Sequence, residues 1–291
     1  MTFSHDLIKG WITVVTRFHH SPLFSRVWVF CTAIILYTAG VIWWQETSLK
    51  TKTLLDADSA IFSGMIMGLL LVFRTNSAYD RWWEARKLWG QLVNDSRNLC
   101  LKVSHYVKAT EEERDYLGRL LIAFGFSLKE HLRNKKTPEE MVGLEELLLP
   151  ANHVPFEIAS LIYKQLETWK QSGKLDGFEM LLLDTHAKAL MDICGACERI
   201  KNTPVVYSYR LMMRQGILLN LLALPWYLFP EFKLWCVPLV LISSYFLIGL
   251  ELIAEDIEEP FGGEGDDLQL DAYCNTIKTS VINGLELKDI P

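Results

Sequence analysis

The sequence predicts an all-α integral membrane protein in which four transmembrane helices continue into a cytosolic helical domain. Half of the 291 residues are hydrophobic, yet Lys, Arg, Asp and Glu still make up 22%. This mixture indicates a membrane part joined to a sizeable aqueous part. Four apolar segments occur in two closely spaced pairs, and no long run of alternating β-branched residues argues for a sheet.

The first pair of apolar segments predicts a transmembrane hairpin over residues 27–73. Val27 to Trp44 carries no charge and is long enough to cross roughly 30 Å of hydrocarbon. Ser59 to Phe73 is shorter, which a helix tolerates when it packs among neighbours instead of facing lipid on all sides. The helical period then continues through Arg74 without a turn signal. We therefore expect this helix to continue beyond the membrane as a charged one.

The second pair predicts a hairpin over residues 211–250, with one span up to Pro230 and the next from Leu234. The preceding stretch, "CERIKNTPVVYSYR", contains Pro204, which must end or kink the helix before it because proline lacks a backbone N–H. Asn202 and Thr203 can satisfy the freed backbone groups. This stretch therefore predicts a joint that leads into the third span.

Basic residues beside the spans predict the orientation. They concentrate on one side of the membrane, and the excess of Lys and Arg marks the cytoplasmic side. Both termini and the long middle segment are therefore expected in the cytoplasm, with the chain crossing the membrane several times. The basic residues on the cytoplasmic side are Lys9, Arg17, Arg26, Arg74, Arg81, Arg86, Lys87, Arg199, Lys201, Arg210 and Arg214, against Lys50, Lys52 and Lys233 on the other side.

The remaining segments complete the domain plan. Residues 1–26 form an N-terminal cytosolic or interfacial segment, residues 74–210 a cytosolic helical domain, and residues 251–291 an acidic loop followed by a C-terminal helix. Within the middle domain, "EEERDYLGRLLIAFGFSLKEHL" opens with acids and ends with basic residues, as the helix dipole favours. The stretches "RNKKTPEE" and "LPANHVP" predict breaks between helices.

The sequence contains no constellation typical of an enzyme. It has no nucleophile elbow, phosphate-binding glycine loop or dinucleotide fingerprint, and its seven histidines show no metal-ligand spacing. Cys194 and Cys197 form a CxxC, but they lie at helical spacing without a second such pair, which is typical of packing. The net charge of −6 argues against a nucleic-acid partner. We expect no enzymatic activity and no required cofactor.

The second span carries two superimposed patterns. Gly64 and Gly68 form a GxxxG, which lets a neighbouring helix approach closely. Met65, Leu69 and Phe73 follow at four-residue steps and form an apolar stripe. The spacing alone leaves two interpretations open. The stripe is either ordinary bundle core or a hydrophobic constriction at the axis of an oligomer.

An acidic stretch, "EDIEEPFGGEGDDLQLD", follows the last span. Hard oxygen ligands on a glycine-bearing loop suit a calcium ion, although the spacing does not match an EF-hand. A solvated acidic turn is the alternative interpretation. The residues leave both open.

Three motifs in this order resemble bacterial members of the bestrophin family: "FRTNSAYDRWWEARKLWGQL", "CERIKNTPVVYSY" and "EEPFGGEGDDL". The resemblance covers almost the whole chain. It implies a homopentameric ring in the lipid bilayer of the bacterial inner membrane, with one central pore that conducts small monovalent ions. Chloride is the family expectation, and cations are the alternative if Glu251, Glu255 and Asp256 face the pathway. A membrane transporter or a non-catalytic membrane scaffold is the rival class, although none of the spans carries a central charge.

The resemblance also assigns residues. Met65, Leu69 and Phe73 match the three pore-facing positions of a hydrophobic neck. Phe178, in "SGKLDGFEML", matches a second constriction at the cytosolic mouth. The side chains that correspond to the family's calcium site are Glu259, Glu264 and Asp267. Animal members have Asn where Glu259 stands and a denser acidic run after it.

Overall fold

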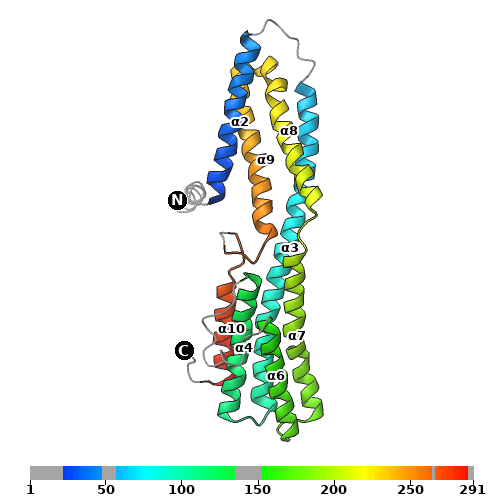
Figure 1. The fold of residues 1–291 in the computed structure, drawn as a ribbon, viewed down its shortest axis with the longest axis vertical. Coiled ribbons are helices and arrows are strands. Elements are labelled where there is room, and N and C mark those ends of the chain that lie inside the picture. The colour runs from blue at the N-terminus through cyan, green and yellow to red at the C-terminus, as the bar shows by residue number, and fades with distance from the viewer. Residues whose placement is uncertain (1–21, 48–56, 135–152, 264–265, 288–291) are drawn as a thin grey trace, which may run out of the picture. The chain divides into compact units, whose positions relative to one another are not determined.

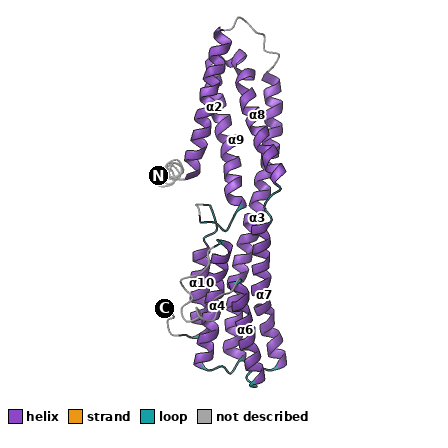
Figure 2. Ribbon diagram, in the orientation of Figure 1, coloured by secondary structure: helices purple, strands orange, loops and turns teal. Residues whose placement is uncertain are grey.

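The computed structural model describes residues 22–47, 57–134, 153–263 and 266–287, and their regular structure is helical throughout (Figures 1 and 2). This confirms the all-α fold class. The elements are α2 (Pro22–Thr47), α3 (Ala57–Tyr106), α4 (Glu111–Leu132), α6 (Val154–Gln171), α7 (Gly177–Asn202), α8 (Tyr207–Phe232), the 3-10 helix η1 (Lys233–Trp235), α9 (Cys236–Glu258) and α10 (Leu270–Leu285).

The chain forms two compact units. The first contains the residues up to Asp80 together with Val205–Glu258, and the second contains Arg81–Pro204 together with the residues from Glu259 onward. The 50-residue helix α3 contributes its N-terminal part to the first unit and its C-terminal part to the second. The prediction that one helix continues past Arg74 is therefore confirmed.

The first unit is a bundle of α2, the N-terminal part of α3, α8 and α9. Helix α9 packs against both α2 and α8 (Figure 1). Its apolar core joins residues of all four helices: Ile34, Met67, Leu71, Ile217, Leu221, Leu224, Cys236 and Val240. Helices α3 and α8 approach closely at Gly216, where a Cβ atom would lie 3.0 Å from Cε of Met67. Any larger residue at this position would have to displace that methionine.

Partly buried polar side chains of the first unit form hydrogen bonds between helices. The indole N–H of Trp226 donates to the hydroxyl of Tyr37 at 2.9 Å, and that hydroxyl donates to the carbonyl of Leu222 at 3.0 Å. The amide of Asn220 on α8 donates to the hydroxyl of Ser63 on α3 at 3.0 Å. An unpaired polar group among apolar helices is costly, so these bonds fix how the helices face one another.

Three segments of the described chain are long and apolar enough to cross a membrane: Ser25–Thr47, Ile61–Tyr106 and Tyr207–Glu258. The last one contains α8 and α9, which η1 separates. The four predicted spans therefore correspond to α2, the N-terminal part of α3, α8 and α9. The positions of the domain boundaries in a bilayer stay predictions.

The second unit consists of the C-terminal part of α3 with α4, α6, α7 and α10. Helix α4 packs against both α6 and α10, and its C-terminal half is buried on almost every side. Two tryptophans, Trp89 and Trp169, are fully buried in the core. Leu99 and Leu120 lie in the same cluster. This unit therefore has its own hydrophobic core. It contains most of the predicted domain of residues 74–210, and α10 from the predicted C-terminal segment packs in the same unit.

Local sequence signals explain where the helices of the second unit begin and end. Thr110 and Glu113 form a capping box at the start of α4, and Asp176 and Glu179 form another at the start of α7. Helix α7 ends at Asn202, two residues before Pro204, as predicted. The last turn of α7 contains the basic residues Arg199 and Lys201, which complement the negative end of the helix dipole.

Truncation of a core residue tests the packing of the second unit. We expect Leu99→Ala to lower the free energy of unfolding by about 2–5 kcal/mol, because it leaves a cavity in a fully buried site. Leu101 lies on the same helix and is 51% exposed. Its replacement by alanine is the matched control and should change stability by less than about 1 kcal/mol. Thermal melting of the purified protein measures both, and equal losses would contradict this packing.

Candidate functional site

The predicted neck residues lie on an exposed face of α3. Met65 is 73% exposed, and Leu69 and Phe73 are each 58% exposed. The opposite face of the same helix is buried in the bundle, with Leu71 only 2% exposed. The stripe is therefore not part of this chain's own core. Among the described residues it is a free surface, which lipid, another copy of the chain or a pathway can adjoin.

The glycine pair on α3 is also open. A Cβ atom on Gly64 or Gly68 would have no heavy atom of the described chain within 4 Å, apart from its own surroundings in the helix. Close helix packing inside the described chain occurs at Gly216 instead. No helix of the described part of the chain packs on Gly64 and Gly68, so their role in helix packing stays a prediction.

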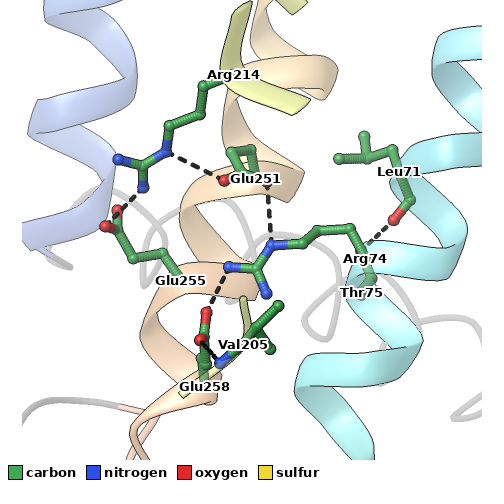
Figure 3. A network of polar contacts seen from close by, with 8 residues as sticks. All are labelled: Leu71, Arg74, Thr75, Val205, Arg214, Glu251, Glu255 and Glu258. Atoms are coloured by element: carbon green, nitrogen blue, oxygen red, sulfur yellow. Dashed lines mark hydrogen bonds and ion pairs between the residues drawn. The ribbon is translucent and has the colours of Figure 1, made fainter. Parts of the chain in front are cut away.

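Arg74, the residue directly after the stripe, is the centre of a buried ion-pair network (Figure 3). The Arg74 side chain has no exposed surface, and its Nη2 donates to Oε2 of Glu258 at 2.6 Å. Its Nε lies 3.6 Å from Oε2 of Glu251. Both glutamates belong to α9 and are themselves buried. A cation without water needs such partners, so Arg74 ties α3 to the end of α9.

The network extends to α8 and to the chain that precedes it. Arg214 on α8 donates to Oε1 of Glu251 at 3.2 Å and pairs with Glu255 at 2.6 Å (Figure 3). Glu258 accepts a further bond from the backbone N–H of Val205 at 2.9 Å. The network therefore joins α3, α8, α9 and the residue that follows Pro204. Neither Glu251 nor Glu255 is left as an unpaired acid.

The joint before α8 is held from within the second unit as well. Arg81 donates to the carbonyl oxygens of Ile200 and Thr203, and Ile200 accepts at 2.6 Å. These are carbonyls at the end of α7, which have no partner inside the helix. A cation at this negative end of the dipole is favourable. Arg81 thus caps α7 where the sequence predicts the helix to stop.

The acidic loop of the second unit is held by cations and backbone bonds. The N–H of Leu268 donates to the carbonyl of Pro260 at 3.0 Å, which closes the loop. Arg133 donates to the carbonyl of Gly262 at 2.9 Å, and the indole of Trp82 donates to that of Asp266 at 3.1 Å. These bonds hold the backbone of the loop in place.

The described part of the loop does not assemble a calcium ligand set. Glu259 is exposed, and the carboxylate of Asp267 lies against Gly262, where a Cβ atom would be 2.5 Å from Oδ2. Glu264 lies outside the described residues. Calcium binding by these three side chains stays a prediction.

Two cations at the C-terminal end of α4 hold the start of α10. Lys129 donates to Oδ1 of Asp271 at 2.8 Å, and Arg133 donates to Oδ2 at 3.3 Å. The Lys129 ammonium beside Asp271 holds the pKa of that carboxyl below its usual range. These pairs connect the residues after the acidic loop to α4.

Phe178 is the second residue of α7 and is 83% exposed. The capping box at Asp176 fixes the start of this helix, so the aromatic ring is presented outward from a rigid turn. Leu181, one turn further on, is 65% exposed. Phe178 and Leu181 therefore form an exposed apolar surface at the start of α7, and the role of Phe178 as an aperture stays a prediction.

All six cysteines are buried and free. Cys194 and Cys197 lie in α7 within the core of the second unit, as the packing interpretation of the CxxC predicts. Burial raises the pKa of the Cys194 thiol to about 12 and that of Cys197 further. Neither thiol is reactive at neutral pH.

The sequence did not identify the partners of Arg74. Glu251 and Glu258 follow a different span, and nothing in the spacing connects them to α3. The one available signal was Arg74 itself, a cation that follows an apolar run with no turn between them. A buried arginine requires a carboxylate, and the acids that end the fourth span were the available ones.

Comparison with known proteins decides the family. The family model described as bacterial and fungal bestrophin protein matches residues 2–283. The chain is a member of the bestrophin family. A relative from Nostoc sp., named voltage-dependent anion channel-forming protein, is 35% identical over 285 residues, which cover 94% of this chain and 91% of the relative. A relative of the same description from Escherichia coli is 31% identical over 291 residues, which cover 97% of this chain and 94% of the relative.

The fold of this bestrophin also matches solved structures. A crystal structure of a bacterial bestrophin homologue from Klebsiella pneumoniae superposes with a TM-score of 0.80. The two sequences are 24% identical, and the match covers 91% of this chain and 99% of the homologue's chain. The family and the apolar helices together make this bestrophin a membrane protein.

Breaking the Arg74 network tests its structural role. We expect Arg74→Met to destabilise this bestrophin by about 3–5 kcal/mol, because Glu258 is then a buried charge without its cation. The double variant Arg74→Met/Glu258→Gln removes that charge while the amide can still accept from Val205. It should melt above the single variant.

Arg199 gives the matched control, because its pair with Glu84 is exposed and such pairs contribute about 0–1 kcal/mol. Arg199→Met should melt within a few degrees of the parent. A single Arg74 variant as stable as that control would show that the network is not structural.

Proposed function

We propose that this bestrophin is one subunit of a homopentameric anion channel, with Met65, Leu69 and Phe73 lining the neck of a central pore. The observation that carries the proposal is the exposure of this stripe, although the helix that bears it is packed on its opposite face. A single chain leaves the stripe and the Gly64–Gly68 face uncovered. A ring of copies would cover the glycine face with a neighbouring helix and place the stripe at the axis.

An apolar ring supplies a gate of a simple kind. Ions keep their hydration shells, and a narrow apolar passage disfavours the water that accompanies them. Three successive rings at four-residue steps along α3 extend this barrier over about 12 Å, at 1.5 Å per residue. The neck would therefore limit conduction without any charged group.

Two observations support anions as the permeant ions. Relatives with 35% and 31% identity are named voltage-dependent anion channel-forming proteins. Of the three acids that would favour cations if they faced the pathway, Glu251, Glu255 and Asp256, the first two are paired with Arg74 and Arg214. With these charges compensated, the first unit offers little reason for cation selection.

Further parts of the proposal concern position and regulation. The proposed location is the inner membrane of a bacterium, with both termini in the cytoplasm; the positive-inside bias supports this orientation. Phe178 forms a second, cytosolic aperture, which its exposure at the rigid start of α7 supports. The acidic loop is the proposed calcium-responsive element, through Glu259, Glu264 and Asp267. The channel needs no resident cofactor.

Widening the neck tests the pore assignment. We expect the triple variant Met65→Ala/Leu69→Ala/Phe73→Ala to raise single-channel conductance or open probability, because a wider ring is more easily hydrated. The protein should still assemble, since these side chains contribute nothing to the core of the chain. Leu71→Ala on the buried face is the matched control and should lower the melting temperature without raising the current. A triple variant that melts early and conducts like the parent would remove the stripe from the pore.

Assembly and selectivity are tested on the purified protein. Native mass measurement should show a ring of five chains as the active species. Bilayer recordings in asymmetric chloride salts should give a reversal potential near that of chloride. A stable monomer as the active species would contradict the pore model, and a reversal potential at the cation value would contradict anion selection.

The calcium proposal has a separate test. If the loop binds calcium, added calcium should raise the melting temperature, because a ligand of the native state stabilises it. The Glu259→Ala/Glu264→Ala/Asp267→Ala variant should lose this shift. If the melting temperatures of the parent and this variant respond equally across a wide range of calcium concentrations, the loop has a structural role only. Arg133 and Trp82 are then the groups that hold it.

A further inference from the structure

Three metal-ligating side chains meet in the second unit, far from the acidic loop's own carboxylates in sequence. Oε1 of Glu198 lies 2.6 Å from Nε2 of His131 and 2.8 Å from Nε2 of His153. His131 lies in the last turn of α4, His153 caps α6, and Glu198 lies in the last turns of α7. The two imidazole rings are 4.6 Å apart between their centres.

The donor set and its geometry suit a transition metal. The three ligand atoms all lie within 4.8 Å of one another. Metal–nitrogen and metal–oxygen bonds of about 2.0–2.2 Å in a tetrahedral site place ligand atoms roughly 3.3 Å apart. Oε1 of Glu198, now 2.6 and 2.8 Å from the two nitrogens, would therefore have to move away from them by roughly 0.5–0.7 Å. Two imidazoles with one carboxylate favour first-row transition metals over calcium or magnesium.

The site is neither sealed nor fully exposed. The exposed fraction of the side chain is 29% for His131, 35% for His153 and 28% for Glu198. Solvent can therefore reach the cluster and could fill a fourth coordination position. Lys201 lies nearby and donates to the backbone carbonyl of His131 at 3.0 Å. Its charge opposes a cation, so the ligands must outweigh it.

The hydrogen bonds define which protons have to move. Nδ1 of His153 accepts from the backbone N–H of Phe156 at 3.1 Å, so the ring hydrogen lies on Nε2 and points to Glu198. A metal on Nε2 would take the place of that hydrogen, which then has to lie on Nδ1. The bond from Phe156 would be lost. Metal binding is therefore coupled to release of the cap at the start of α6.

We propose that His131, His153 and Glu198 form a binding site for a divalent first-row transition metal that links the ends of α4 and α7 to the start of α6. The site uses none of the residues assigned to the pore. It would stabilise the second unit by connecting three helices through one ion. Loss of channel function would therefore leave this proposal standing, and the reverse also holds.

Zinc titration of the full chain tests the site. The protein is purified in detergent with a tag that contains no histidine, treated with a chelator and titrated with zinc ions in a calorimeter. We expect about one zinc ion per chain, and a rise in the melting temperature. His153→Asn removes a ligand but keeps a residue that caps helices well, and Glu198→Gln keeps the shape without the charge. Each should weaken zinc binding at least tenfold.

His186→Ala is the matched control. His186 pairs with the single carboxylate of Asp95 at 2.8 Å, and the described residues bring no third ligand to that pair. The zinc affinity of the His186→Ala variant should equal that of the parent. Melting of each variant without metal shows whether it is folded. Parent and His153→Asn proteins that bind zinc equally would overturn the proposal, as would a parent that binds none.

Amide exchange supplies a second measurement that does not depend on variants. With zinc bound, the amide of Phe156 should exchange faster, because it loses its bond to His153. The visible absorption spectrum of bound cobalt ions should be typical of a low coordination number with nitrogen ligands. Zinc that binds without any change at Phe156 would place the metal elsewhere and overturn the assignment.

Discussion

The burial of one guanidinium constrains most of the first unit. Arg74 has no exposed surface in a bundle whose other buried residues are largely apolar, so its charge must be compensated inside the chain. Glu251 and Glu258 can do this only if the end of α9 lies beside α3. Because Glu258 also accepts from Val205, the same constraint fixes the chain that leads into α8. The bundle therefore cannot rearrange its helices freely without exposing a charge to an apolar environment.

This arrangement explains why the short apolar run of α3 ends in an arginine with no turn. The helix needs no turn, because it continues as one element to Tyr106. It also needs no lipid contact on its inner face, where Met67 and Leu71 are buried. The outer face, which carries the proposed neck residues, is exposed in the described chain. One helix therefore serves both the interior of a subunit and the interior of the proposed ring.

Much of the fold followed from local sequence. The four apolar runs became α2, α3, α8 and α9, and Pro204 predicted the end of α7 to within two residues. These features depend on hydrophobic period and backbone chemistry, which act over a few residues. The candidate sites were harder to predict from the sequence. The spacing of Met65, Leu69 and Phe73 could not show which face of α3 would be buried, and only family resemblance favoured a pore. The contact of His131 with Glu198 joins residues 67 positions apart and depends on packing between helices.

The burial of every thiol in the chain also affects how the protein can be labelled. Sulfhydryl reagents react with thiolates that solvent can reach, and all six native cysteines are enclosed within the two units. The folded protein is therefore silent toward such reagents without any prior removal of cysteine. A cysteine introduced on the outer face of α3 would be the reactive thiol of its chain, so modification rates could be read directly as a map of water access along that helix.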